Sequence, residues 1–248
     1  MIDDFLKNKN ILITGAGKGI GEQLVYDCLE GGAFVYCLIK SKGDNSKFKN
    51  LTNIKIFNGD VNNTKVFKSI FNYSLKNKKL INGLVNNAGI RQRKKFVDIS
   101  KTDLKKIFDT NFFAIFNLLQ SYFKYVQQNK VNSSIVNIGS IVGKLGFNDL
   151  SGYASTKSAL EGLTKSLALD FAEFGSRINI IQPGFTKTSF YQKFKKNKKL
   201  YNWTLNRTPL KRWGEPAEIS NLIIFLLSDY SKYITGESIS VDGGWSNA

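Results

Sequence analysis

The chain has 248 residues, a formal net charge of +17 and no histidine. Without histidine, and with only two cysteines, zinc sites and histidine-based catalytic triads are excluded, so we expect no bound metal. The positive charge alone would suit a nucleic acid or a membrane surface. The lysines are scattered, however, and no nucleic-acid-binding motif accompanies them, so we interpret them as solvated surface charge and expect neither partner.

The composition favours one globular domain over residues 1–248, because 42% of the residues are hydrophobic and no proline- or serine-rich linker divides the chain. The opening segment, MIDDFLKNKN, lacks the apolar core of a signal peptide. No apolar run reaches the roughly 18 residues that cross a membrane. Two cysteines are too few for a disulfide framework, which favours a cytoplasmic location.

Short apolar runs alternate with amphipathic stretches of helical length along the whole chain. Strands are predicted at residues 10–14, 34–39, 54–58, 83–87, 134–139, 178–182 and within 237–244, and helices at 20–30, 62–76, 101–128, 152–174 and 216–228. This alternation predicts an α/β fold with a single Rossmann-type, doubly wound parallel sheet of about seven strands, covered by helices on both faces. Ligands of such folds bind beyond the carboxyl ends of the strands.

A glycine-rich segment, ITGAGKGIG at 13–21, follows the first strand and opens the first helix. Its glycines permit a tight turn whose backbone N–H groups can approach a dinucleotide pyrophosphate, although a plain glycine-rich turn is the alternative. An NAD-binding fold places an acid after the second strand, whereas Lys40, Ser41 and Lys42 stand there, with Lys18 nearby. We therefore predict NADP(H), the alternative being ordinary surface lysines.

Tyr153 precedes Lys157 by four residues, which places both on one face of a helix. An ammonium beside a phenol favours the phenolate, so we expect a lowered pKa for Tyr153. Tyr153 is then a candidate general acid and base in a chain without histidine. Taken alone, the spacing is also that of an ordinary amphipathic helix pair.

Six motifs in register resemble the short-chain dehydrogenase/reductase family from residue 10 to the C-terminus. They are the glycine segment Thr14–Gly21, the NNAG at 86–89, Asn111, Ser140, the pair Tyr153 and Lys157, and the PG at 183–184. Any one of them is weakly specific, whereas six in order are highly specific.

The resemblance implies a role for each matching residue. It implies that Tyr153 exchanges a proton with the substrate while a hydride passes to or from the cofactor. Ser140 would hydrogen-bond the substrate oxygen, Lys157 the nicotinamide ribose, and Asn111 a water that links Lys157 to solvent. The predicted cofactor-binding residues are Gly15, Lys18, Gly19, Ile20, Gly21, Lys40, Ser41, Asp60, Val61, Asn87, Ala88, Gly89, Tyr153, Lys157, Pro183, Gly184, Thr186 and Thr188.

The resemblance also implies that a lid at about 186–213, with Ser140 and Tyr153, holds the substrate. Five lysines between 193 and 199, and Arg91, Arg93, Lys94 and Lys95, could face the substrate mouth, and Arg93 is the candidate contact. Such a mouth favours an anionic substrate, either a keto-sugar or sugar acid or a 3-oxoacyl thioester. The alternative is a solvated lysine helix without contact to substrate.

The family resemblance implies a homotetramer in which the helices at 101–128 and 152–174 pair across a two-fold axis. The first helix carries Phe108, Phe112, Phe113, Phe116, Tyr122 and Phe123, more aromatic surface than one face against a sheet needs. A thick core is the alternative. Some proteins that resemble this family are cofactor-binding regulators without activity, but they usually lack the tyrosine or the lysine that this chain keeps.

Overall fold

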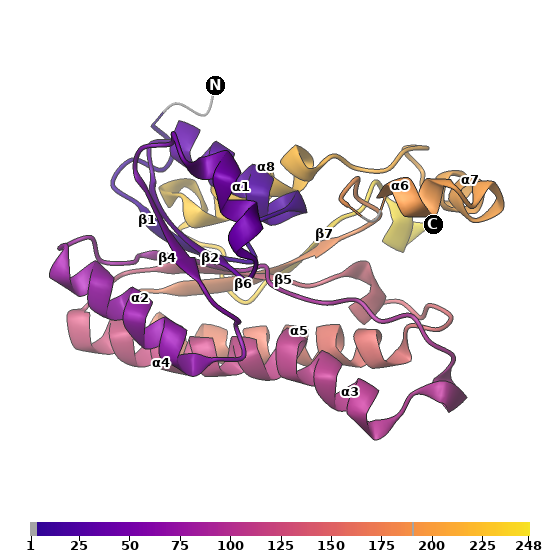
Figure 1. Cartoon of the computed structure of the whole chain (residues 1–248), viewed down its shortest axis with the longest axis horizontal. Coiled ribbons are helices and arrows are strands. Elements are labelled where there is room, and N and C mark those ends of the chain that lie inside the picture. Colours follow the sequence, from indigo (N-terminus) through magenta and orange to yellow (C-terminus); the bar gives the residue numbers. More distant parts are fainter. Residues whose placement is uncertain (1–3, 190) are drawn as a thin grey trace.

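Seven parallel strands form the centre of the fold in the computed structural model, which describes residues 4–189 and 191–248 (Figure 1). The sheet order is β3-β2-β1-β4-β5-β6-β7. The strands are β1 (Asn10–Thr14), β2 (Phe34–Ile39), β3 (Ile54–Asn58), β4 (Gly83–Asn86), β5 (Ser134–Ile138), β6 (Arg177–Pro183) and β7 (Ser238–Val241). The prediction of a doubly wound parallel sheet is confirmed.

Helices cover both faces of this sheet. The helices α1 (Gly19–Glu30) and α8 (Pro216–Leu227) lie above it in Figure 1, and α2 (Thr64–Lys76), α4 (Ala114–Asn129) and α5 (Ser151–Ala172) lie below it. Each layer encloses its own apolar core. Because both faces are buried, strands such as β2, FVYCLI, are apolar without alternation.

The predicted helix at 101–128 is divided into three parts. The helix α3 (Lys101–Phe108) begins at a capping box made by Ser100 and Asp103, a π-helical turn follows at Asp109–Phe113, and α4 then continues. The periodicity of a sequence does not report one wider turn, because a π-turn inserts a single extra residue without ending the helix.

The chain between β6 and α8 is not a single lysine helix. It contains two short helices, α6 (Tyr191–Lys195) and α7 (Lys198–Arg207), which lie beside the C-terminus in Figure 1. Trp213 is 1% exposed and packs against the rings of Phe185, Phe194 and Tyr201. This aromatic cluster attaches the segment to the end of β6.

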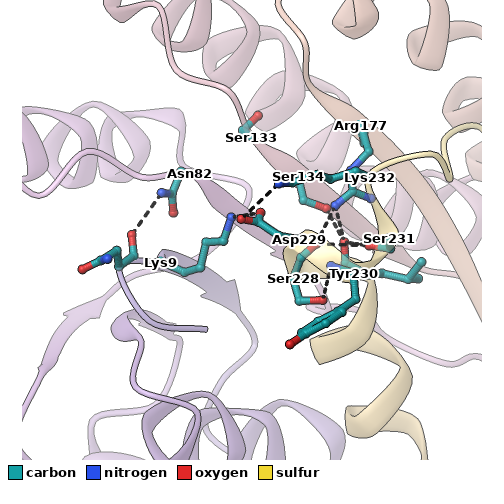
Figure 2. A network of polar contacts seen from close by, with 12 residues as sticks. Lys9, Asn82, Ser133, Ser134, Arg177, Ser228, Asp229, Tyr230, Ser231 and Lys232 are labelled. Atoms are coloured by element: carbon teal, nitrogen blue, oxygen red, sulfur yellow. Dashed lines mark hydrogen bonds and ion pairs between the residues drawn. The ribbon is translucent and has the colours of Figure 1, made fainter. Parts of the chain in front are cut away.

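Polar contacts connect the amino ends of β1 and β6 to the end of α8 and the residues after it (Figure 2). Arg177, at the start of β6, donates to the carbonyls of Leu226 at 2.8 Å and Ser228 at 3.1 Å, which satisfies the last turn of α8. Lys9, just before β1, pairs with Asp229 at 2.7 Å. We interpret this end of the sheet as structural, since its polar groups are paired with one another.

The strand order reverses between β1 and β4, because the chain first runs outward through β2 and β3 and then returns. At such a switch point the loops diverge and leave a crevice at the carboxyl ends. Among the described residues, no helix is long and apolar enough to cross a membrane.

Candidate active site

The glycine-rich turn between β1 and α1 depends on residues without a side chain. Gly15 and Gly19 have φ angles of +65° and +59°, in the left-handed region that glycine tolerates. A Cβ on Gly21 would collide with the Gly15 carbonyl oxygen. Lys18, at the N-cap of α1, makes no side-chain cap, so the first N–H groups of the helix remain available to an anion.

Hydrogen bonds hold the residues after β4 against this turn. The Thr14 hydroxyl accepts hydrogen bonds from the N–H groups of Asn87 and Ala88, both at 3.1 Å, and lies 3.3 Å from the Val85 carbonyl, to which it donates. The Asn87 amide donates to the Gly15 carbonyl at 3.0 Å. Two motifs about 70 residues apart thus form one surface.

The residues predicted after β2 and β3 meet at the outer end of the crevice. The Lys40 ammonium lies 2.7 Å from an Asp60 carboxylate oxygen, and this contact, with the Asn62 N–H, lowers the pKa of Asp60. Ser41 is exposed, and Val61 is half-buried. Lys40 itself stays largely exposed and can reach a ligand from there.

Sequence reasoning missed Lys47. Its ammonium donates to the Gly17 carbonyl at 2.7 Å and lies 2.8 Å from Glu22, so a second cation is held against the glycine turn. Its place in the short helical segment Lys42–Phe48 brings it back toward α1. No motif marks it, because the contact depends on how this connection folds.

Lys157 is buried beneath the crevice. Its ammonium donates a 2.7 Å hydrogen bond to the Ile138 carbonyl at the end of β5. Burial lowers the pKa of Lys157 to about 8. The pKa of this lysine therefore lies closer to neutral pH than that of an exposed lysine.

The expected lowering of the Tyr153 pKa is wrong for the protein chain by itself. Burial raises the pKa, and the lowering by a hydrogen bond with Ser140 and by the charge of Arg91 does not offset it. Lys157 is directed at a carbonyl and lies 5.8 Å from the tyrosine ring centre, so it is not the cause of any shift. Tyr153 and Lys157 do lie on one helix as predicted, but the raising of the tyrosine pKa by desolvation is the larger effect.

Asn111 lies in the π-turn, fully buried. Its amide oxygen accepts from the Ile90 N–H at 2.8 Å, and its nitrogen donates to the Ile90 carbonyl at 2.9 Å. Thr156, on α5, is 3.3 Å from the same nitrogen. A Cβ on Gly89 would lie 3.3 Å from the Asn111 oxygen. The π-turn thus connects the end of β4 to the helix that carries Tyr153.

Ser140 follows β5, and its hydroxyl accepts from the Val142 N–H at 3.2 Å. The turn after it lies against α5, where a Cβ on Gly143 would approach the Lys157 Cβ to 2.9 Å. Ser158 donates to the Gly143 carbonyl at 2.6 Å. This close approach sets the position of Ser140 relative to Tyr153.

These elements enclose a cavity of about 530 Å³, which Ser140 and Tyr153 both line. The predicted cofactor residues that also line it are Lys18, Ile20, Gly89, Pro183, Gly184, Thr186 and Thr188. These residues fit a dinucleotide, because Gly19 presents backbone without a side chain to the cavity. A Cβ on Gly19 would lie only 3.3 Å from the Thr188 Cγ2 and would fill this space.

A second cavity, of about 430 Å³, adjoins the first, and Arg91, Phe147 and Phe185 line both. Arg93 and Arg207 line only the second. The sequence prediction included Arg207 in the lid at about 186–213 but did not single out Arg207 or Trp245 as a cavity residue, because nothing in the sequence shows that the two meet. Of the lid lysines, Lys195, Lys196, Lys198 and Lys199 are exposed, and Lys94 pairs with Asp103 at 2.6 Å.

Comparison with known proteins agrees with this geometry. A family model described as enoyl-(acyl carrier protein) reductase matches residues 15–246. The chain is 33% identical to the 3-oxoacyl-[acyl-carrier-protein] reductase of Thermotoga maritima, over 96% of this chain and 98% of that protein. It is 35% identical to a tropinone reductase homologue of Arabidopsis thaliana, over 97% and 93%.

Solved structures are similar over nearly the whole length. A putative gluconate dehydrogenase from Agrobacterium tumefaciens has a TM-score of 0.93, 28% identity and full coverage of both chains. A 4-hydroxyisoleucine dehydrogenase complexed with NADH and the protein ElxO with NADP bound have TM-scores of 0.91 and 0.89, each 31% identical over 97% of this chain and 99% of theirs. The chain belongs to the short-chain dehydrogenase/reductase family, whose oxidoreductases use NAD(P)(H), and it is an oxidoreductase of this kind.

Proposed function

We propose that the chain is an NADP(H)-dependent oxidoreductase that interconverts a ketone and a secondary alcohol, with Tyr153 as the general acid and base. The observation that carries this proposal is that the hydroxyls of Tyr153 and Ser140 line the same cavity as the glycine turn. A carbonyl oxygen placed between the two hydroxyls would receive two hydrogen bonds. We propose residues 1–248 as one dinucleotide-binding and catalytic domain.

In the reducing direction, Tyr153 donates its proton to the carbonyl oxygen as that oxygen gains negative charge, and Ser140 hydrogen-bonds the same oxygen. A nicotinamide cofactor, when bound in this cavity, would supply the hydride for the carbonyl carbon. The phenolate left on Tyr153 regains a proton by way of Lys157, whose pKa near 8 suits transfer at neutral pH. Asn111 anchors the water that connects Lys157 to solvent.

The preference for NADP(H) rests on this chain's own residues, because one similar structure holds NADH and another NADP. β2 ends without a carboxylate, and Lys40 and Ser41 follow it. Lys18 lines the neighbouring cavity. Two cations and a hydroxyl are the groups that recognise a ribose 2′-phosphate.

The substrate we propose is anionic, a keto-sugar or sugar acid or a 3-oxoacyl thioester, held by Ser140, Tyr153 and Arg93 beneath a lid at about 186–213. Arg93 lines the second cavity, and Asp149 lies 3.7 Å from its guanidinium. Among the described residues, the positive charge on the wall of the second cavity comes from Arg91, Arg93 and Arg207 and not from lid lysines.

A conservative substitution of the tyrosine tests the reaction. Tyr153→Phe should lower kcat by about a hundredfold or more in ketone reduction with NADPH, because general acid catalysis is lost. NADPH binding, followed by its fluorescence, should stay within about threefold, because the ring remains. Tyr233→Phe, at a fully exposed position, is the matched control. Turnover of Tyr153→Phe near the wild-type rate would contradict the assignment.

We also propose a homotetramer in the cytoplasm. The apolar side chains of Phe113, Phe116 and Leu169 stay exposed on the helices expected to pair, whereas Tyr122 is buried in the core. Cys28 and Cys37 are buried free thiols, as suits a reducing compartment. Sedimentation of the wild type and of Leu169→Lys tests the assembly, and a wild-type mass of one chain would refute it.

A further inference from the structure

The second cavity combines positive charge with apolar walls. The guanidinium groups of Arg91, Arg93 and Arg207 line it, and no carboxylate is among its lining residues in the described chain. Burial lowers the pKa of Arg91, and electrostatic repulsion by Arg93 adds a smaller lowering. An anion in the cavity would relieve this repulsion.

Arg207 packs against the ring of a buried tryptophan. Its guanidinium carbon lies 5.1 Å from the ring centre of Trp245, a cation–π contact. Trp245 is 1% exposed and is held by the rings of Phe147 at 6.0 Å and Phe185 at 4.9 Å. Within the described residues no carboxylate is recorded in salt-bridge range of Arg207, so its guanidinium remains available to an anionic ligand in the cavity that it lines.

The walls suit an apolar ligand body better than a polyhydroxylated one. Aromatic rings and leucines make up most of the lining, and Asn148 is its one uncharged polar side chain among the described residues. Each buried sugar hydroxyl would need a hydrogen-bond partner, and one left without a partner costs free energy. An aliphatic or aromatic body is accommodated without that cost.

The two cavities adjoin at Phe147 and Phe185, which line both of them. A molecule whose carbonyl lies against Tyr153 and Ser140 can therefore extend between these rings toward Arg207. The volume of about 430 Å³ is within the range of small-molecule sites.

We propose that this arginine-lined cavity binds the carboxylate end of a keto acid or hydroxy acid with an apolar body, and that Arg207 determines this specificity. The proposal rests on the proposed ketone reduction and narrows its substrate from sugar acids and thioesters to apolar free acids. No covalent step beyond that reduction is involved.

A turnover experiment compares linear keto acids with their methyl esters, 5-ketogluconate and an acetoacetyl thioester, all with NADPH. We expect kcat/KM for the acids to exceed that for the esters by about tenfold or more, the value of a charge-assisted hydrogen bond. Arg207→Gln should lower kcat/KM for the acids about tenfold through KM and leave the esters within about twofold. Lys199→Gln, an exposed charge on the same helix α7 that does not line the cavity, should change neither.

A binding experiment does not depend on turnover. Hexanoate carries a carboxylate and an apolar body but no ketone, and Trp203 and Trp245 line the cavity, so its binding should change the tryptophan emission. Hexanoate should bind about tenfold more tightly than hexan-1-ol, and Arg207→Gln should remove that difference.

The two experiments separate the two proposals. Equal binding of hexanoate and hexan-1-ol, or equal turnover of acids and esters, overturns the carboxylate site even where Tyr153-dependent reduction of ketones is measured. Preferred turnover of 5-ketogluconate or of the thioester also overturns it. Hexanoate binding that depends on Arg207, in a protein that reduces no ketone, supports the site and refutes the reaction.

Discussion

The Lys157 ammonium donates a 2.7 Å hydrogen bond to the Ile138 carbonyl, which joins the middle of α5 to the end of β5. The same helix carries Tyr153, and the same strand leads to Ser140. A buried cation thus fixes the distance between the two hydroxyls proposed to hold the substrate. Burial of this charge lowers the free energy of unfolding by an amount that depends on pH.

Lys157→Met should change how stability depends on pH. The pKa of the folded lysine is about 8, and an unfolded lysine has one near 10.4, so between these values the unfolded chain binds more protons. The stability of the wild type relative to the variant should therefore rise with pH across this window, by on the order of 3 kcal/mol. Urea unfolding at several pH values measures it, and a difference that is flat or falls with pH would contradict the lowered pKa of the buried lysine.

Gly21→Ala should abolish tight binding of NADPH. The new Cβ would collide with the Gly15 carbonyl oxygen and would lie 2.5 Å from the Asn87 amide, so the glycine turn must shift. We expect a loss of at least about tenfold in affinity and a destabilisation of roughly 1–3 kcal/mol. The control is Gly162→Ala on α5, where nothing lies within 4 Å and a helical glycine is replaced by a better helix former. Unchanged NADPH affinity in Gly21→Ala would show that the turn does not hold the cofactor.

Lys18→Gln and Lys40→Gln should each weaken the binding of NADPH without weakening the binding of NADH. If the two ammonium groups contact the 2′-phosphate, removal of either should raise the NADPH dissociation constant by about tenfold. Lys49→Gln, an exposed lysine on the connection after β2, is the control for net charge. Equal effects on both cofactors would mean that the lysines act only through long-range charge.

Gly143→Ala should impair turnover while cofactor binding persists. The added Cβ would approach the Lys157 backbone carbon and Cβ, both to 2.9 Å, so the turn after Ser140 must move away from α5. We expect kcat to fall by about tenfold or more, because small misplacements of a reacting group are costly. An unchanged kcat would indicate that the Ser140 position is not set by this contact.

Much of the fold was predictable because its signals are local. The runs NILIT and FVYCLI are continuous and apolar, and both form strands at the predicted bounds. The turn at Gly15–Gly21 needs glycine for reasons of backbone geometry, so its identity is visible in the sequence. The π-turn at Asp109–Phe113 was not visible, because one inserted residue leaves the helical pattern nearly intact.

The sequence by itself determined the order of strands and helices, the glycine turn and the spacing of Tyr153 and Lys157, since each depends on neighbours along the chain. Only the tertiary structure decided the direction of the Tyr153 pKa, because burial depends on every element packed around the ring. It also decided that Arg207 and Trp245 line the second cavity, where no lid lysine in the described part of the chain is found. The residues that meet there lie far apart in the sequence, from Arg91 to Trp245.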